Sequence, residues 1–181
     1  MSRPASAQLT IALIGATLAV VLLATPPAPA AAADAALATL ADRAAIEDLL
    51  VGYYSGLGTG KSDYSAYYLP EGVLNVDGLT ASGAQGIADL YKKAGATLPH
   101  GGTFRMLLTN LRVNVSGESA TADAIWTGVY SETVNSAPQI IEQGREHDEL
   151  VKRSGRWLFK LRLITTDGGR RAMPAVLDGQ R

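Results

Sequence analysis

The chain has 181 residues, of which 47% are hydrophobic and 18% are charged, and these values fit one globular domain. Its formal net charge of -1 excludes a strong overall attraction to nucleic acid or to an anionic membrane surface. The absence of cysteine excludes disulfides, thiolate nucleophiles and cysteine-ligated zinc, and the two histidines are too few for a histidine-rich metal site, so we expect no metal.

The first 33 residues have the pattern of a secretory signal peptide. Arg3 gives a weakly positive start, residues 9–24 form an uninterrupted apolar run, and prolines and small residues follow up to Ala33. The apolar run is shorter than the roughly 20 residues of a membrane-spanning helix. We therefore expect cleavage before Asp34 and a periplasmic or secreted mature protein that makes no membrane contact. A retained membrane anchor is the alternative.

Three helices are predicted in the first half of the mature chain. Apolar residues recur at helical spacing over 37–57, where a run of glycines ends the pattern. A short second helix is predicted over 61–69, which carries three tyrosines, and a third over 84–94. These helices supply the apolar faces that a sheet would need to cover one of its sides.

Strands dominate the second half of the chain. A short strand is predicted at 73–76, before the Asp77-Gly78 turn. Four long strands with alternating apolar residues and tight turns are predicted at 103–115, 119–134, 139–153 and 156–166. The order of elements predicts the α+β class, with three N-terminal helices packed on an antiparallel sheet. We expect one domain at 34–167 and a flexible tail at 168–181.

Five segments, in this order, resemble SnoaL-like proteins of the nuclear transport factor 2-like superfamily. They are ADRAAIEDLLVGYY at 41–54, YLPEGVLNVDG at 68–78, GAQGIADLY at 83–91, LLTNLRVNVSGESATADA at 107–124 and GREHDELVKRSGRWLFKLRLI at 144–164. The resemblance covers nearly the whole mature chain. It implies a strongly curved antiparallel sheet that helices close into a cone-shaped α+β barrel, an apolar cavity inside the cone, and homodimers that pack sheet against sheet.

The resemblance does not carry over the proton relay of the dehydratase and cyclase members. Those members pair a tyrosine on the first helix with an aspartate five residues later and a histidine early on the first long strand. Tyr53 matches the tyrosine, but Gly58 and Met106 stand at the other two positions. Any catalysis must therefore use other residues.

Two carboxylates on the third long strand are the strongest catalytic candidates. Alternation places Glu146 and Asp148 on one face of that strand, which the resemblance turns toward the cavity. Partly buried carboxylates raise one another's pKa, so one of them could act as a general acid or base near neutral pH. Tyr53 would polarise the substrate by hydrogen bonding. The alternative for Asp148 is a structural ion pair with Arg162.

A set of mostly aromatic side chains is expected to bind the substrate. On the second long strand, small residues are followed by Trp126 and Tyr130 on the same face, which leaves room for a flat apolar ligand. His147 faces away from the acids unless a β-bulge shifts the register. The expected substrate-binding residues are Tyr54, Tyr67, Tyr68, Met106, Trp126, Tyr130 and His147.

These observations favour a cofactor-independent lyase or isomerase that abstracts a proton from a hydrophobic cyclic or aromatic small molecule. Substitution of Glu146 by glutamine is then expected to abolish turnover. The alternative functions are a non-catalytic periplasmic module that binds a similar ligand, and a dimeric interaction domain. The loss of polar groups at Gly58 and Met106 favours the binding module.

Overall fold

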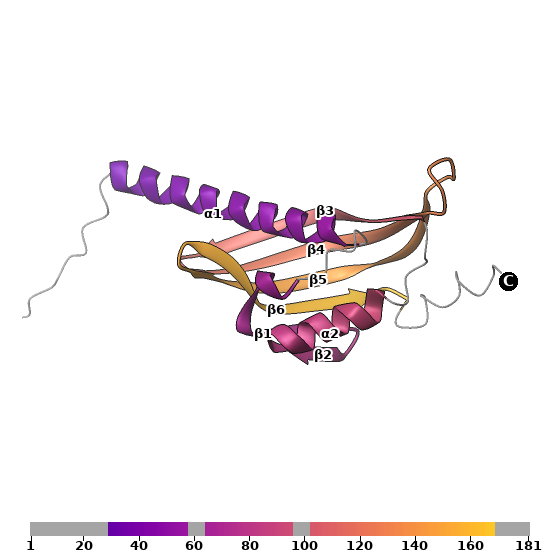
Figure 1. Cartoon of the computed structure of the whole chain (residues 1–181). Helices are drawn as coiled ribbons and strands as arrows, with labels where there is room; N and C mark the ends of the chain where they lie inside the picture. The colour runs from indigo at the N-terminus through magenta and orange to yellow at the C-terminus, as the bar shows by residue number, and fades with distance from the viewer. Residues whose placement is uncertain (1–28, 58–63, 96–101, 169–181) are drawn as a thin grey trace, which may run out of the picture.

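A computed structural model of the chain describes residues 29–57, 64–95 and 102–168 (Figure 1). Its helical elements are α1 (Pro29–Gly56), the 3-10 turn η1 (Ser65–Tyr67) and α2 (Gly83–Gly95). Its strands are β1 (Tyr68–Val76), β2 (Leu79–Ser82), β3 (Thr103–Ser116), β4 (Ser119–Ser131), β5 (Gln139–Arg153) and β6 (Arg156–Thr166).

The strands form one six-stranded sheet in the order β2-β1-β6-β5-β4-β3. All neighbouring pairs are antiparallel except β1 and β6, which are parallel. The four long strands follow one another as hairpins, as their alternation and turn residues predict. Because β1 pairs with β6, the first and last strands of the chain are neighbours in the sheet.

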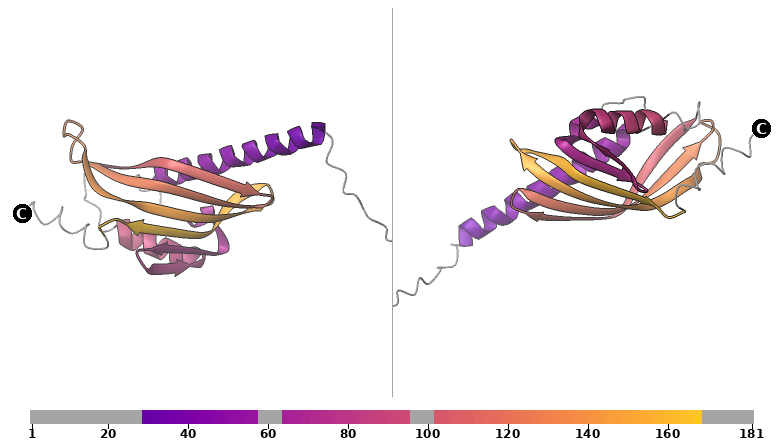
Figure 2. Two further views of the ribbon diagram at one scale, coloured as in Figure 1. Left: turned by 180° about the vertical axis from the view of Figure 1, so that it is seen from behind. Right: turned by 90° about the horizontal axis from the view of Figure 1, so that it is seen from below.

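Both helices cover the same face of the curved sheet, with α1 crossing beside β3 and α2 lying over β1 and β2 (Figures 1 and 2). The core between these layers joins Ile46 and Leu50 of α1 and Ile87 of α2 to Leu150 and Phe159 of the sheet. This layered arrangement confirms the α+β class and the curved sheet that the sequence predicted.

The first helix is longer than the sequence predicted. It begins at Pro29 rather than near Leu37, and its N-terminal part extends beyond the edge of the sheet (Figure 1). Residues 30–41 are exposed, so this part of α1 contributes nothing to the core. The alanine-rich sequence explains the extension, because alanine has the highest intrinsic helix propensity.

The predicted second helix is present only as a single turn in its described part. Only Ser65–Tyr67 form a helical turn, and Tyr68 already begins β1. Pro70 disfavours helical geometry at the preceding residue, and β1 pairs with β6 instead. The sequence also missed β2, a short edge strand that is mostly exposed and therefore lacks an alternating pattern. β4 ends at Ser131, before the predicted Val134.

Within the described ranges, neither helix is long and apolar enough to cross a membrane. Most of the predicted signal peptide, Gly58 and residues 169–181 lie outside those ranges.

Candidate functional site

The two candidate carboxylates lie on the inner face of β5. Glu146 is directly opposite Ala124 of β4, and Asp148 is directly opposite Ala122. Both acids are buried, whereas the intervening residue and its neighbours on the outer face are more exposed. The alanines place small side chains beside both acids, so the carboxylates reach past the sheet surface toward the helices.

Arg162 of β6 holds the two acids together. It stands opposite Asp148 in the register of β5 and β6, and its side chain is completely buried. Its Nη2 lies 2.7 Å from Glu146 Oε2, and its Nε lies 3.3 Å from Asp148 Oδ1. The guanidinium therefore forms ion pairs with both carboxylates, and the ion pair proposed as the alternative role of Asp148 is present.

Aromatic rings enclose the guanidinium of Arg162. Its central carbon lies 3.9 Å from the centre of the Tyr53 ring, 4.6 Å from that of Phe159 and 4.8 Å from that of Tyr54. Such cation–π contacts contribute more when they are shielded from water, as here. The rings fix the plane of the guanidinium and so the positions of its three nitrogens.

Two tyrosine hydroxyls complete the cluster. Tyr54 donates a hydrogen bond to Glu146 Oε2, the same oxygen that Arg162 Nη2 contacts. The hydroxyl of Tyr53 lies 3.3 Å from that of Tyr68. Consecutive residues of α1 thus have different partners: Tyr54 binds the acid, while Tyr53 stacks on the arginine. The tyrosine that hydrogen-bonds the acid is thus Tyr54, next to the Tyr53 that the sequence predicts to polarise the substrate.

Within the described ranges, five buried polar atoms of this cluster have no hydrogen-bond partner. They are Glu146 Oε1, both carboxyl oxygens of Asp148, and Nε and Nη1 of Arg162. Buried polar atoms usually have partners, because an unpaired one costs about 1–3 kcal/mol. Buried polar atoms without partners that cluster around three ionisable side chains are typical of a functional site.

Burial raises the pKa of the Asp148 carboxyl well above its ordinary value. Arg162 acts in the opposite direction without cancelling the effect, and the Glu146 charge adds to it. Burial likewise raises the pKa of the Tyr54 hydroxyl well above its ordinary value, so this hydroxyl keeps its proton and acts as a donor. The Asp148 carboxyl is therefore harder to ionise than an exposed aspartate.

The remaining predicted binding residues are spread over the inner face and its margin. Tyr68 is buried in the core, and the Tyr67 ring meets the Tyr53 ring edge-on with centres 5.3 Å apart. Trp126 is buried over Gly144, and its Nε1 donates a hydrogen bond to the carbonyl of Arg145 at 3.3 Å. Met106 and Tyr130 are half-buried.

His147 does not join the cluster. It lies on the outer face of β5, where its Nδ1 is 2.7 Å from Asp123 Oδ1 of β4. The register between β4 and β5 is unbroken from Ser119 to Gly128, so no bulge turns His147 inward. The prediction that it contributes to substrate binding finds no support in this position.

Sequence reasoning underestimated Arg162 and overlooked Tyr91. Strict alternation from Trp157 predicts Arg162 on the outer face of β6, but the register shift between Glu149 and Leu150 turns it inward. Tyr91 of α2 lies with its ring centre 6.0 Å from that of Tyr53. Its helical spacing from Ile87 would have placed it inside the cone. Among the described residues, no group of three or more histidine, aspartate or glutamate side chains is placed to hold a metal ion.

Comparison with known proteins agrees with this fold. Residues 38–162 match the family described as "SnoaL-like domain", whereas no similar sequence was found among curated proteins. A nuclear transport factor 2-like protein of Novosphingobium aromaticivorans with a cystatin-like fold superposes with a TM-score of 0.63, at 22% identity over 80% of this chain and 94% of that one.

Two further structures share the fold. A Catenulispora acidiphila protein in complex with S-DNPA has a TM-score of 0.62, at 20% identity over 71% of this chain and 96% of that one. A protein of N. aromaticivorans provisionally named a scytalone dehydratase has a TM-score of 0.58, at 20% identity over 70% and 85% of the two chains. The chain belongs to the SnoaL-like domain family and has the nuclear transport factor 2-like fold.

Proposed function

We propose that the protein is a cofactor-independent lyase or isomerase that removes a proton from a hydrophobic cyclic small molecule. One observation carries the proposal. Tyr54 and Arg162 anchor one oxygen of the buried Glu146 carboxylate, while its other oxygen, Oε1, has no partner among the described residues. A carboxylate that is fixed at one oxygen and unpartnered at the other is suited to accept a proton from a bound substrate.

The same cluster can stabilise the charge that proton removal creates. When Glu146 Oε1 takes a proton from the carbon next to a carbonyl, the C–H electron pair forms a carbon–carbon double bond, the carbonyl π pair moves to the oxygen, and an enolate forms. Arg162 Nη1 would donate a hydrogen bond to that oxygen. Return of the proton to another carbon completes an isomerisation, and loss of a leaving group from the neighbouring carbon completes an elimination.

The aromatic side chains of the interior favour a hydrophobic cyclic substrate. Tyrosines from α1, η1 and α2 surround the ionic cluster, and the Tyr64 and Tyr91 rings lie 4.6 Å apart between centres. Tyrosine offers flat apolar surface together with a hydroxyl donor, which suits a ring that carries oxygen substituents. The likeness of the fold to the protein provisionally named a scytalone dehydratase agrees with this class.

Hydrogen–deuterium exchange tests the proposal without knowledge of the natural substrate. The probe is 2-tetralone, a cyclic ketone with acidic C–H bonds, and proton NMR in D2O follows the loss of its α-protons. We expect the wild-type protein to accelerate exchange over buffer and Glu146→Gln to lower the enzymatic rate about a hundredfold or more. Glu149→Gln is the matched control, because Glu149 lies on the outer face of the same strand and pairs with Lys160. Equal rates for wild type and Glu146→Gln would refute the role of Glu146.

A non-catalytic ligand-binding module is the second candidate function. The observation that favours it is the complete burial of Asp148 and Arg162, whose ion pair closes the cluster to solvent. This function predicts saturable binding of 2-naphthol, which mimics the enol of 2-tetralone, without any acceleration of exchange. The enzyme proposal predicts saturable binding of 2-naphthol and also accelerated exchange of 2-tetralone.

We further propose that the chain is exported and works as a homodimer. Residues 30–33 are exposed on α1, so cleavage before Asp34 would leave the core untouched. N-terminal sequencing of the mature protein tests this.

The outer face of the sheet exposes Leu107 by 50% and Leu163 by 37%, which favours a partner there. Light scattering of the wild type and of Leu163→Lys tests the dimer.

A further inference from the structure

Tyr91 connects α2 to the buried cluster around Arg162. The helix lies on the same face of the sheet as α1, over β1 and β2 (Figures 1 and 2). The Tyr91 ring packs on the Tyr64 ring at 4.6 Å between centres and meets the Tyr53 ring edge-on at 6.0 Å. Because the Tyr53 ring in turn stacks on the guanidinium of Arg162, Tyr91 is one contact away from that cation.

The hydroxyl of Tyr91 lies close to the charges of the cluster. Burial raises its pKa well above the ordinary value, while Arg162 acts in the opposite direction and the carboxylates of Asp148 and Glu146 add to the increase. Since the interaction between charges weakens with distance, the hydroxyl end of the side chain is directed toward the cluster, although the residue as a whole is only half-buried. The hydroxyl keeps its proton at neutral pH and is available as a donor.

This hydroxyl of Tyr91 has no hydrogen-bond partner within the described ranges. The other tyrosine hydroxyls of the cluster are paired. Tyr54 donates to Glu146, and the hydroxyl oxygens of Tyr53 and Tyr68 lie 3.3 Å apart. A donor left unpaired beside buried charges is unfavourable, and a bound molecule that supplies an acceptor would remove this cost.

Tyr91 and Arg162 offer their hydrogen bonds at different places. The rings that enclose the guanidinium within the described ranges belong to other residues, so the Tyr91 ring does not stack on it. Arg162 Nη1 is the donor that we assign to the carbonyl oxygen of the substrate. The Tyr91 hydroxyl is therefore a second donor, set apart from the first, and it fits a second oxygen atom.

We infer that Tyr91 is a substrate-binding residue whose hydroxyl donates a hydrogen bond to a second oxygen substituent of the ring system. This role rests on the proposed function, and it narrows the substrate to cyclic compounds that carry an oxygen atom besides the reacting carbonyl group. Such a hydrogen bond selects between substrates, because a compound that lacks the oxygen leaves the donor unpaired.

Two derivatives of 2-naphthol test this role on the full chain. The compounds 2,6- and 2,7-dihydroxynaphthalene carry a second oxygen on the other ring, and fluorescence titration measures the affinity for each. We expect the wild-type protein to bind at least one of them about fivefold or more tightly than 2-naphthol. Tyr91→Phe removes only the hydroxyl. It should reduce this preference to about twofold or less, while its affinity for 2-naphthol stays within about twofold of wild type.

Tyr64→Phe is the matched control. The Tyr64 ring packs on that of Tyr91, but its hydroxyl oxygen lies 3.3 Å from the point where a Cβ of Gly56 would stand. Burial and its neighbour Tyr67 raise the pKa of the Tyr64 hydroxyl, whereas the charges of the cluster do not. This variant should keep the wild-type preference for the dihydroxy compound.

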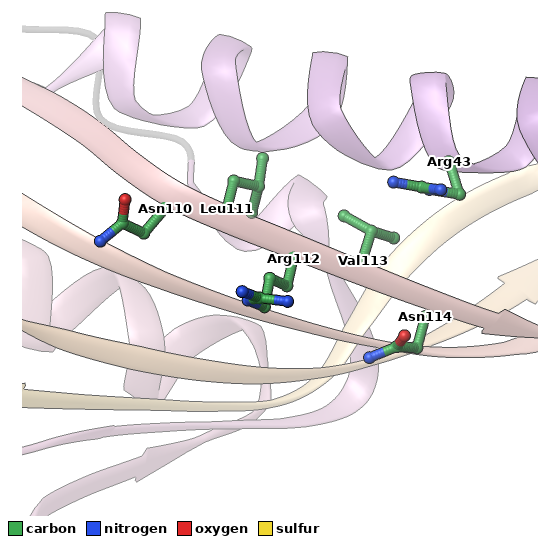
Figure 3. Close-up of a pocket in the computed structure, with 6 residues that line it drawn as sticks. All are labelled: Arg43, Asn110, Leu111, Arg112, Val113 and Asn114. Carbon is green, nitrogen blue, oxygen red and sulfur yellow. The ribbon is translucent and has the colours of Figure 1, made fainter.

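Arg43→Gln controls for binding outside the interior. Figure 3 shows the hollow between α1 and β3, which is lined by Arg43 and residues 110–114 and by no residue of the cluster. A ligand held there would lose affinity in Arg43→Gln. We expect this variant to bind both dihydroxynaphthalenes as the wild type does.

Three results would overturn the role of Tyr91: no preference for either dihydroxynaphthalene in the wild type, a preference that persists in Tyr91→Phe, or an equal loss of affinity for 2-naphthol and the dihydroxy compound in Tyr91→Phe. The third result would show that Tyr91 only supports the fold. Failure of the proposed function has a different signature. A preference that is lost in Tyr91→Phe, without any acceleration of 2-tetralone exchange by the wild type, would keep Tyr91 as a ligand-binding residue and refute the enzyme.

Discussion

Tyr54 and Glu146, which are 92 positions apart in the sequence, are joined by a buried hydrogen bond from the tyrosine hydroxyl to the Oε2 atom of the acid. The bond connects α1 to the centre of the sheet and leaves Oε1 of the same carboxylate without a partner among the described residues. The helix that covers the sheet therefore also orients the group that we propose as the base.

Removal of the Tyr54 hydroxyl should weaken both the fold and the site. Tyr54→Phe deletes a donor to a charged acceptor, and we expect the free energy of unfolding to fall by about 1.5–3 kcal/mol, measured by urea denaturation. Tyr53→Phe is the control, because its hydroxyl lies 3.3 Å from the neutral hydroxyl of Tyr68 and should cost only about 0.5–1.5 kcal/mol. A smaller loss for Tyr54→Phe than for Tyr53→Phe would contradict this account.

Arg162 is a buried cation that contacts both Glu146 and Asp148. Arg162→Met leaves Glu146 and Asp148 without a cation, and we expect it to destabilise the protein by about 3–5 kcal/mol at pH 7. The triple variant that also carries Glu146→Gln and Asp148→Asn should recover much of that loss, because no uncompensated charge remains. Chemical denaturation of both variants measures the difference, and a triple variant less stable than Arg162→Met would show that charge is not the cause.

Asp148 should make stability fall as the pH rises above about 4. Burial raises the pKa of this carboxyl in the folded state, so the folded protein keeps a proton that the unfolded chain releases. The stability contribution is full below the unfolded pKa of about 3.9 and is lost as the pH rises toward the folded pKa. Asp148→Asn removes this loss, so its stability relative to the wild type should increase between pH 4 and 7.

Urea denaturation at several pH values measures that difference. Asp89→Asn, on the exposed side of α2, gives the background dependence. A relative stability of Asp148→Asn that stays flat or decreases over this range would show that Asp148 is ionised throughout.

Asp42 docks α1 on the far end of the sheet. Its Oδ1 accepts hydrogen bonds from Lys152 Nζ at 2.5 Å and from Trp157 Nε1 at 3.1 Å. The Lys152 hydrogen bond lowers the pKa of the Asp42 carboxyl, so its stabilisation is present above pH 4 and is lost as the pH falls through the folded value. We expect Asp42→Asn to cost about 1 kcal/mol at pH 7, because the pair is partly exposed.

The matched control for that change is Asp48→Asn, at an exposed position of the same helix. Thermal unfolding compares the two variants at pH 7 and pH 3. Equal melting temperatures at pH 7 would refute the docking role.

The long strands and the inner face of β5 could be predicted because alternation is a local property of the sequence. The period of two placed Glu146 and Asp148 on the inner face and His147 on the outer face, and the structure has this arrangement. The same holds for α2, whose apolar spacing and bounding glycines are in the sequence.

The partners within the site could not be predicted in the same way. The choice between Tyr53 and Tyr54 as the partner of Glu146 depends on the rotation of α1 over the sheet, which helical spacing does not fix to within one residue. The central position of Arg162 depends on the register between β5 and β6. The sequence predicts only residues 73–76 of β1. The rest of this strand depends on its parallel pairing with β6, a long-range contact that local sequence patterns do not reveal.

The central claim is that Glu146 moves a proton rather than merely holding the site together. The most direct measurement compares, in Glu146→Gln, the affinity for 2-naphthol with the rate of 2-tetralone exchange. If Glu146 is the base, the affinity of Glu146→Gln for 2-naphthol should lie within about threefold of wild type, while its rate of 2-tetralone exchange should fall about a hundredfold or more. Exchange and affinity that fall together by the same factor, or exchange that persists, would contradict it.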